Sequence, residues 1–526
     1  MSIRVKRYLR AASVTTTAAM LAASGGLGGA GAAGAAVPAA GGVPNGGTLH
    51  VLTVGTQWPG LDSATDTQDT ADANFLNAIY GQLFELAPGN KVVPDEATGY
   101  KFSNNFQTVT INLRHGLKFS NGDPLTAADV AWSINRVLDP KNANIGAVNF
   151  PTKGPVTASG PYTIVANLSR PDSAFIHAFI NEAPNWTVDQ KALESMGATA
   201  YAQHPIGSGP FEVVSNKASS QLVLKKNPNY WAKGLPRLDG LTFTAVGTDQ
   251  SAASALQSGG DQLALAISTI PLLKKLPSQG LTVTKAPSTI TDFVALNEQN
   301  APFKDIRARQ AVAYATDAPA LASKLYLGEY PIVQAQTAPG QEFYKQRNKY
   351  FPAYNLAKAK ALVQQLGGLS VNLSTTTNTA YWTTEVEALS TMWEAAGIKV
   401  NIQDNTLQQM LQITFNHTWQ AIDSNWGNNI DPSINDPQFF RTGGPFSGVS
   451  DPTLDKLFNE SSATASPAAR AKIFQQINNR ENQQFDAVWL YSKRAFAVST
   501  KQLVPGGGLG NNLGIIRWEY LGLKKS

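Results

Sequence analysis

Residues 369–402, LSVNLSTTTNTAYWTTEVEALSTMWEAAGIKVNI, decide the fold class. Apolar and polar side chains alternate over residues 369–373 and again over residues 398–402, and this alternation predicts two strands. Between them, residues 384–396 carry apolar side chains at helical spacing. A strand, a helix and a second strand in this order predict parallel strands joined by a crossover helix. The chain is therefore expected to be an α/β protein.

The same alternation of strands and helices continues through the rest of the chain. Strands are predicted at residues 48–54, 108–114 and 488–491. Thr126 and Asp129 have the spacing of a capping box, which predicts a helix that begins there and ends at Asp139-Pro140. A length of 526 residues exceeds one typical domain, and no internal repeat or low-complexity linker divides the body. We therefore expect domains that are connected by several chain crossings.

The composition is that of a globular protein, since 43% of the residues are hydrophobic and 15% are charged. The sequence has no Cys, which excludes disulfides, thiolate metal sites and a Cys nucleophile. Its five His residues are scattered, and no pair has the spacing that puts two imidazoles on one helix face. The sequence also lacks the motifs of phosphate-binding loops, serine hydrolases and zinc proteases. No metal, no cofactor and no catalytic residue are therefore predicted.

Residues 1–42 are typical of a signal peptide followed by a tail of small residues. Four positive charges lie in the first ten residues, an apolar run follows at 11–23, and a Gly- and Ala-rich tract follows at 24–42. A disordered tail is the alternative, and this order of segments disfavours it. Because these four charges account for most of the net charge of +5, the charge gives no support for nucleic-acid binding.

Four stretches of the chain resemble the motifs of one family. They are YGQLFEL (80–86), LRHGLKFSNGDPLTAADVAWSINRVLDP (113–140), PIGSGPFEVVSNKASSQLVLKKNPNYW (205–231) and LNEQNAPFKDIRARQAVAYATD (296–317). With these motifs in this order, the chain resembles the extracytoplasmic solute-binding proteins of family 5, the peptide/nickel type of ABC importer. The second stretch is the most specific of the four.

The resemblance implies a two-lobed, periplasmic-binding-protein-like fold of type II, in the large variety with three subdomains and a hinge between the lobes. It places lobe I at 44–86, 205–289 and 494–526, an inserted subdomain at 87–204, and lobe II at 290–493. It also implies an exported monomer, in the periplasmic space or at the outer face of the cytoplasmic membrane. Such a protein captures peptides or similar-sized polar solutes in an interlobe cleft and delivers them to an ABC permease with its ATPase subunits.

The loop at residues 425–432, NWGNNIDP, is the richest candidate for ligand contact because it combines Gly and Asn with an aromatic side chain. Its candidate residues are Trp426, Asn428, Asn429 and Asp431. In the peptide-binding relatives, the position of Asn428 holds an Asp that pairs with the α-ammonium of the ligand, and an amide does not supply that charge. Asp431 is a substitute for this Asp, and a turn or capping role before Pro432 is the alternative.

Three aromatic residues complete the candidate site. Trp58 follows the first predicted strand, and Tyr381 and Trp382 follow the strand at 369–375. Open α/β sheets bind ligands beyond the carboxyl ends of their strands, which is the position of all three residues. For both Trp residues, packing within the loop is the alternative role.

Two other functions stay open at the level of the sequence. One is an exported hydrolase that acts on peptides or oligosaccharides, which needs a cleft with acid and base groups of perturbed pKa. The other is a sensor that presents its ligand to a signalling protein instead of an importer. The sequence does not identify the ligand among peptides, sugars and metal chelates.

Overall fold

The computed structural model describes residues 42–55, 58, 60–65, 70–142, 144–376, 380–427 and 429–524. The chain divides into two compact units, Met1–Gly31 and Ala32–Ser526, and every described residue lies in the second unit. The predicted signal peptide and its tail, residues 1–42, therefore fall outside the described residues except for Gly42. Within the described ranges, no helix is both long enough and apolar enough to cross a membrane.

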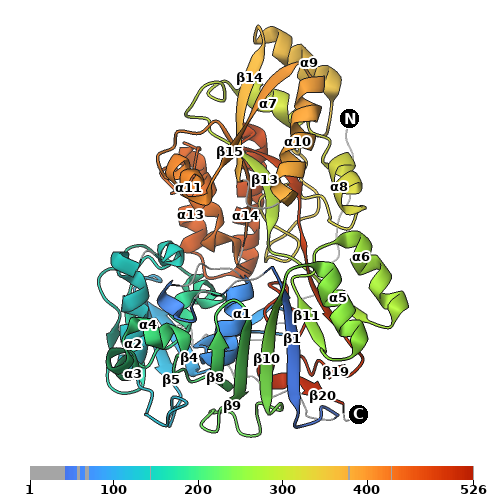
Figure 1. Ribbon diagram of the computed structural model, residues 1–526. Helices are drawn as coiled ribbons and strands as arrows, with labels where there is room; N and C mark the ends of the chain where they lie inside the picture. Colours follow the sequence, from blue (N-terminus) through green and yellow to red (C-terminus); the bar gives the residue numbers. More distant parts are fainter. Residues whose placement is uncertain are drawn as a thin grey trace, which may run out of the picture. The chain divides into compact units, whose positions relative to one another are not determined.

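A seven-stranded mixed sheet collects its strands from distant parts of the chain (Figure 1). β1 runs parallel to β10 on one side and to β11 on the other, and β18 runs antiparallel between β11 and β12. Leu49, Val51 and Phe243 are buried in the core beside this sheet. In order across the sheet, the strands are β12 (Thr282–Pro287), β18 (Arg494–Ser499), β11 (Leu263–Leu265), β1 (Thr48–Val54), β10 (Gly240–Val246), β9 (Gln221–Lys226) and β8 (Phe211–Lys217).

A second, four-stranded sheet lies within residues 97–167. Its order is β4 (Ala97–Ser103), β5 (Thr108–Leu113), β7 (Thr163–Asn167) and β6 (Thr157–Ala158), and all of its pairs are antiparallel. Helix α2 (Ala127–Leu138) packs against β6 and β7, and its buried residues include Val130 and Ile134. The predicted capping box is confirmed, because the side chains of Thr126 and Asp129 both bond the first turn of α2.

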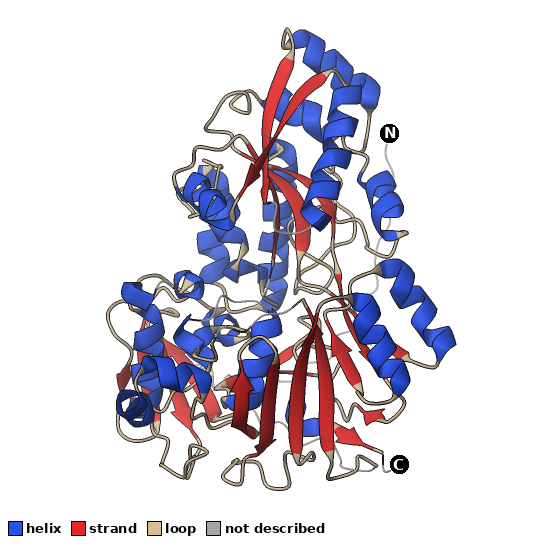
Figure 2. Cartoon of the chain, in the orientation of Figure 1, coloured by secondary structure: helices blue, strands red, loops and turns tan. Residues whose placement is uncertain are grey.

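A five-stranded sheet contains the βαβ unit that the sequence predicts. β14 (Leu369–Thr376) runs parallel to β15 (Ile398–Asn405), and α10 (Ala380–Ala395) connects them. Helices lie on both faces of this sheet (Figure 2). Val371 and Leu373 belong to the core on one face, and Phe293 and Trp489 belong to the core on the other. The strand order is β15, β14, β16 (Ala421–Trp426), β13 (Thr291–Leu296) and β17 (Ala487–Tyr491).

The remaining elements connect and cover these sheets. Two small antiparallel sheets have two strands each: β2 (Phe84–Ala87) pairs with β3 (Lys91–Pro94), and β19 (Leu503–Val504) pairs with β20 (Gly522–Leu523). The other helices are α1 (Thr70–Ile79), α3 (Gln190–Met196), α4 (Ala198–Gln203), α5 (Asp249–Ser258), α6 (Ile270–Lys275), α7 (Ile306–Ala315), α8 (Ala318–Tyr326), α9 (Leu356–Gln365), α11 (Leu407–Phe415), α12 (Asp436–Phe440), α13 (Pro452–Ser462) and α14 (Pro467–Gln484).

The chain passes directly between the seven-stranded and five-stranded sheets at two places, which we call the hinge crossings. Residues 288–290 connect β12 to β13, and residues 492–493 connect β17 to β18. The crossings contact each other, since the Ser492 hydroxyl donates a hydrogen bond of 2.7 Å to the carbonyl of Ile290. Two short neighbouring connections between packed sheets are the arrangement of a hinge between lobes.

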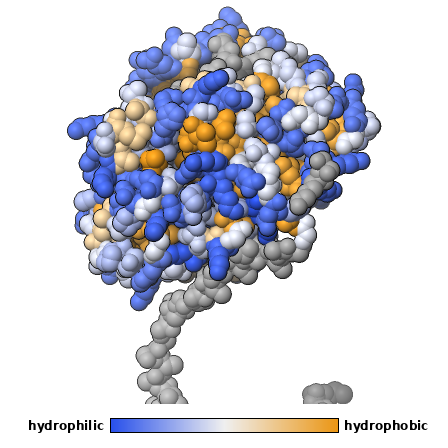
Figure 3. Space-filling model, turned by 60° about the horizontal axis from the view of Figure 1, so that its bottom comes forward, coloured by the Kyte–Doolittle hydropathy of each residue, from blue (hydrophilic) through white to orange (hydrophobic). Residues whose placement is uncertain are grey.

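On the face of the molecule shown in Figure 3, hydrophobic side chains form separate areas surrounded by hydrophilic ones. The large apolar side chains are mostly in the buried cores, and Trp58, Trp186, Trp393, Trp489 and Trp518 are each less than 2% exposed. This distribution is typical of a globular body whose sheets are covered by helices.

Replacing Gly122 with valine is expected to destabilise the turn before α2. Gly122 has a φ of +93°, which side chains rarely adopt, and its amide donates to the Phe119 carbonyl at 2.9 Å. A side chain in this conformation costs about 1–3 kcal/mol, so the melting temperature should fall. Gly99→Val in β4 is the control, because Gly99 has neither a positive φ nor a neighbour within 4 Å of an added Cβ. Equal melting temperatures for the two variants would contradict this account of the turn.

Candidate functional site

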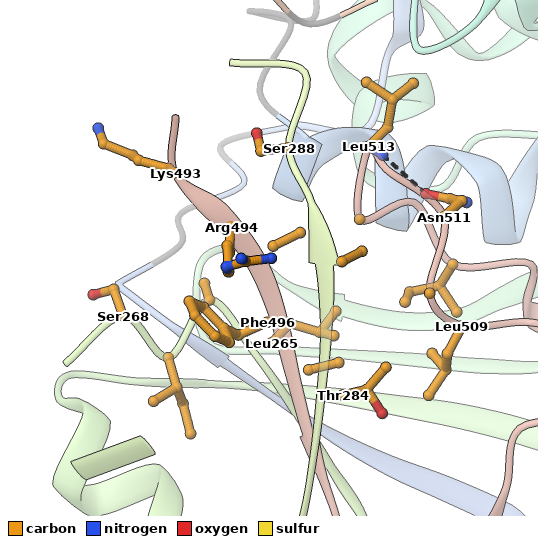
Figure 4. A pocket seen from close by; sticks show the side chains of 18 of the residues that line it. Leu265, Ser268, Thr284, Ser288, Lys493, Arg494, Phe496, Leu509, Asn511 and Leu513 are labelled. Atoms are coloured by element: carbon orange, nitrogen blue, oxygen red, sulfur yellow. Dashed lines mark hydrogen bonds between the residues drawn. The ribbon is translucent and has the colours of Figure 1, made fainter. Parts of the chain in front are cut away.

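A cavity of about 390 Å³ lies beside the hinge crossings, and we call it the hinge cavity (Figure 4). Its walls come from the end of β11, from β12 and β18, and from the loop at residues 509–516. Phe496 and Leu265 lie together in Figure 4, and Leu509 and Leu513 lie on the other side. The volume falls within the range of small-molecule sites, about 300–1,000 Å³, and the mostly apolar lining is also typical of them.

The hinge crossings and the first residue of β18 supply polar groups to this cavity. Ser288, Lys493 and Arg494 line it. The Lys493 Nζ atom lies 3.1 Å from Oδ1 of Asp292 on β13. Arg494 donates from Nε to the Glu329 carbonyl at 3.0 Å, and its Nε lies 3.6 Å from the Glu329 carboxylate. Each cation on the cavity wall therefore has an acidic partner from the lobe that holds the five-stranded sheet.

Behind Lys493 lie three buried acidic side chains, Asp292, Glu385 and Asp423, which we call the carboxyl cluster. Asp292 and Glu385 are 0% exposed and Asp423 is 4% exposed. Burial first, and then the charges of Glu385 and Asp292, raise the pKa of Asp423 well above its ordinary value. The Tyr491 hydroxyl donates a hydrogen bond to Glu385. The cluster thus joins β13, β16 and α10 directly beside the hinge.

Comparison with protein families identifies the chain. The model of the bacterial extracellular solute-binding proteins, family 5, matches residues 91–448, which is more than half of the chain. The chain belongs to this family.

Curated relatives of this family 5 protein match it over part of their length. The glutathione-binding protein GsiB of Shigella boydii serotype 4 (strain Sb227) is 30% identical over 319 residues, which are 60% of this chain. The match spans 61% of the length of GsiB, so about two fifths of GsiB lie outside the match.

Solved structures confirm the fold over nearly the whole chain. The substrate-binding protein CtaP from Listeria monocytogenes has a TM-score of 0.77 at 21% identity, and the match covers 91% of this chain and all of CtaP. DppA from Helicobacter pylori, solved in complex with the peptide STSA, also has a TM-score of 0.77, at 20% identity. That match covers 92% of this chain and 99% of DppA. This family 5 protein therefore has the two-lobed, type II binding-protein fold that the sequence predicts.

Trp382 lies beside a residue of the hinge cavity wall. It belongs to the first turn of α10, and its ring centroid lies 5.4 Å from Nζ of Lys493, which lines the cavity. Tyr381 belongs to the same helix, but its side chain lies outside the part of the chain that the structure describes. Asn428 also lies outside the described residues. The proposed roles of Tyr381 and Asn428 stay predictions.

Trp58 packs inside the core beside the seven-stranded sheet. It is 1% exposed, and its ring centroid lies 4.8 Å from that of Phe75. Its indole Nε1 donates to Oδ1 of Asn216 at 3.0 Å. This burial is the packing that the sequence gives as the alternative, and a ligand contact by Trp58 stays a prediction.

The expected loop around Trp426 is partly wrong, because β16 continues through Trp426. The residue pairs with Thr291 of β13, and this pairing fixes it in the five-stranded sheet. Its ring packs against Phe439 and Phe446, each at 5.3 Å between centroids. The strand partner and both phenylalanines are distant in the sequence, so the Gly- and Asn-rich neighbourhood of Trp426 does not reveal them.

Asn429 and Asp431 are buried and used in internal contacts. The Asn429 amide donates to the His177 carbonyl at 2.9 Å. Asp431 caps the turn at Pro432 by accepting a hydrogen bond from the Ser433 backbone at 3.0 Å, and it forms an ion pair with Arg470. Burial raises the pKa of Asp431, but the charge and hydrogen bonds of Arg470 outweigh it and hold this pKa at about 2. The capping role named as the alternative for Asp431 is thus present.

One group of described residues has the side chains of a metal site. Donor atoms of His177, Glu342 and Asp431 lie within 4.8 Å of one another. However, Arg470 donates hydrogen bonds to both carboxylate oxygens of Asp431. A metal ion at this position would lie beside a guanidinium that already neutralises Asp431, so these residues do not fit a cation site.

The polar residues at the hinge cavity are not among the candidate residues that the sequence predicts. Lys493 and Arg494 follow a predicted strand, and Asp292 lies in a buried strand where an acidic side chain is unusual. A charged residue inside an otherwise apolar strand is the one signal in the sequence that marks Asp292. Its pairing with Lys493 joins positions that are distant in the chain, and only the fold reveals it.

Proposed function

We propose that this family 5 protein is the extracytoplasmic substrate-binding component of an ABC importer. It captures peptides or polar solutes of similar size between its lobes and delivers them to the permease. The observation that carries this proposal is the hinge cavity, because its walls include both hinge crossings and residues of both lobes. A ligand at that position contacts the parts of the chain whose geometry changes when the lobes rotate.

The mechanism is non-covalent. Ligand enters the open form, favours the closed form by its higher affinity for that form, and the closed form docks on the permease. The ATPase subunits of the importer hydrolyse ATP, because this chain has no phosphate-binding loop. The protein itself carries out no catalysis, and its ligand leaves it unchanged.

The protein acts outside the cytoplasm as a monomer, after export directed by residues 1–42. Lobe I comprises about 44–86, 205–289 and 494–526, with the inserted subdomain at 87–204, and lobe II comprises 290–493. Support for this division comes from the sheets, since the seven strands of one and the five strands of the other fall within these ranges. A curated relative named as glutathione-binding and a neighbour solved with a peptide support a peptide-like ligand.

Peptides of two to five residues, with glutathione among them, are expected to raise the melting temperature of the purified protein. A ligand at 100 times its Kd stabilises the folded state by about 2.7 kcal/mol. Thermal shift measures this effect over the panel, and native mass spectrometry identifies any ligand that co-purifies. Intact recovery of each bound peptide is expected. Recovery of cleaved peptides would support the hydrolase instead, and a panel without any binder would contradict the peptide assignment.

A further inference from the structure

The wall of the hinge cavity carries positive charge. Lys493 and Arg494 line it, and none of the described lining residues is acidic. The ammonium of Lys493 has an acidic partner of its own, Asp292 at 3.1 Å. Arg494 has to share its partner, because the Glu329 carboxylate lies 3.6 Å from Nε of Arg494 and 2.8 Å from Nζ of Lys285. Two cations beside one carboxylate leave a positive charge that attracts an anion.

The guanidinium of Arg494 keeps two of its nitrogens for a ligand. Its Nε donates to the Glu329 carbonyl at 3.0 Å, and no described residue accepts a hydrogen bond from Nη1 or Nη2. The side chain is 28% exposed and is drawn among the lining residues in Figure 4. Parallel N–H groups of a guanidinium match the two oxygens of a carboxylate. Arg494 therefore has the chemistry to hold a carboxylate inside the cavity.

Thr53 supplies an independent observation that points to a ligand. It lines the cavity and is 2% exposed, and its hydroxyl oxygen has no hydrogen-bond partner among the described residues. Buried polar atoms in native proteins are nearly always satisfied, so this hydroxyl suits a polar group of a ligand. Thr53 pairs with Leu265, which pairs with Ala497 of β18. The hydroxyl is therefore two strands away from the strand that carries Arg494.

Apolar side chains face each other across the same cavity. Phe496 and Leu265 lie on one side, and Leu509 and Leu513 lie on the other (Figure 4). Contact with these side chains removes the apolar part of a ligand from water, which stabilises the complex. The cavity thus combines a site for a carboxylate, a second polar contact and apolar walls within about 390 Å³.

We propose that the hinge cavity binds the ligand by a carboxylate on Arg494, with an apolar group between the facing walls and an amide beside Thr53. The inference rests on the proposed function and specifies its substrate class as acidic solutes with an apolar body, such as N-acylated dipeptides.

Recognition through a carboxylate does not require an α-ammonium on the ligand. The described lining of the cavity holds no acidic side chain that could pair with an ammonium. Asn428, at the position where the peptide-binding relatives have an Asp, also supplies no negative charge. A ligand whose amino group is blocked by an acyl group therefore loses no ion pair in this cavity.

N-acetyl-alanyl-leucine and its C-terminal amide test the inference in the full-length protein. The two compounds have the same shape, and only the first carries a carboxylate. Calorimetry is expected to show that the acid binds at least about tenfold more tightly than the amide, since a hydrogen bond to a charged group is lost in the amide. Equal binding of the two compounds, or binding of neither, overturns the inference. The proposed function is judged separately and fails only if no member of the peptide panel binds.

Arg494→Gln assigns the effect to the guanidinium. This variant is expected to lose the tenfold preference for the acid while it keeps its affinity for the amide. Lys285→Gln is the matched control, because Lys285 pairs with the same Glu329 carboxylate but does not line the hinge cavity. Melting temperatures of the two variants show whether both are folded. An unchanged preference in Arg494→Gln, or an equal loss in Lys285→Gln, overturns the inference.

Discussion

Replacing Arg470 with methionine is expected to lower the free energy of unfolding by about 3–5 kcal/mol. Arg470 is 5% exposed and Asp431 is 0% exposed, and the Nη2 atom of Arg470 lies 2.9 Å from Oδ1 of Asp431. The same atom donates to the Ser433 hydroxyl at 2.9 Å. Without the guanidinium, Asp431 is left as a buried charge without its ion-pair partner. Urea denaturation at neutral pH measures the difference.

The exposed pair of Arg307 and Asp305 supplies the control. Its side chains are 47% and 36% exposed and screened by solvent, so Arg307→Met should cost far less than Arg470→Met. Acid provides a second check on the buried pair. The pKa of Asp431 is lowered to about 2, so the pair contributes stability above about pH 4 and loses it as the pH falls through about 2. Equal losses in Arg470→Met and Arg307→Met would contradict the role assigned to the buried pair.

Replacing Gly427 with alanine is expected to reduce both stability and ligand binding. Gly427 has a φ of +138°, and an added Cβ would lie 2.0 Å from the Thr289 carbonyl oxygen. Backbone strain and overpacking each cost about 1–3 kcal/mol, so the combined loss is about 2–6 kcal/mol. Thr289 belongs to the first hinge crossing, and its displacement would disturb the hinge cavity. Thermal unfolding and calorimetry with the best peptide of the panel measure the two effects.

Gly443→Ala is the control that shows the effect of backbone strain without the steric clash of an added Cβ. Gly443 also has a positive φ, of +73°, but an added Cβ there meets no atom within 4 Å. This variant should lose only the part of the stability that comes from strain and should bind ligand normally. If Gly427→Ala bound ligand as tightly as Gly443→Ala does, close packing of Gly427 on the crossing would have no role in binding.

Features that depend on neighbouring residues are the ones that the sequence predicts well. The βαβ unit at 369–402 is confirmed, because its strands and helix are set by local alternation and by helical spacing. The capping box of Thr126 and Asp129 is confirmed for the same reason, since its partners are three residues apart. The family motifs also predict the overall fold, and the structural neighbours confirm that prediction.

Features that depend on distant residues are the ones that the sequence does not reveal. Trp426 is fixed by Thr291 and by two phenylalanines on other elements, which no local pattern indicates. The same holds for the contact between Asp292 and Lys493, which forms only when β13 and the second hinge crossing meet. Of the predicted loop candidates, Asn429 and Asp431 have polar side chains that face internal partners.

The position of β18 in the seven-stranded sheet determines when that sheet is completed during synthesis. β18 fills the place between β11 and β12, where Leu265 pairs with Ala497 and Thr282 pairs with Ser499. Until residues 494–499 leave the ribosome, these two strands have no partner between them, and an incomplete sheet exposes unpaired edges. Pairings between such distant residues also form slowly. The lobe that holds the seven-stranded sheet therefore cannot complete this sheet until almost the whole chain has been made.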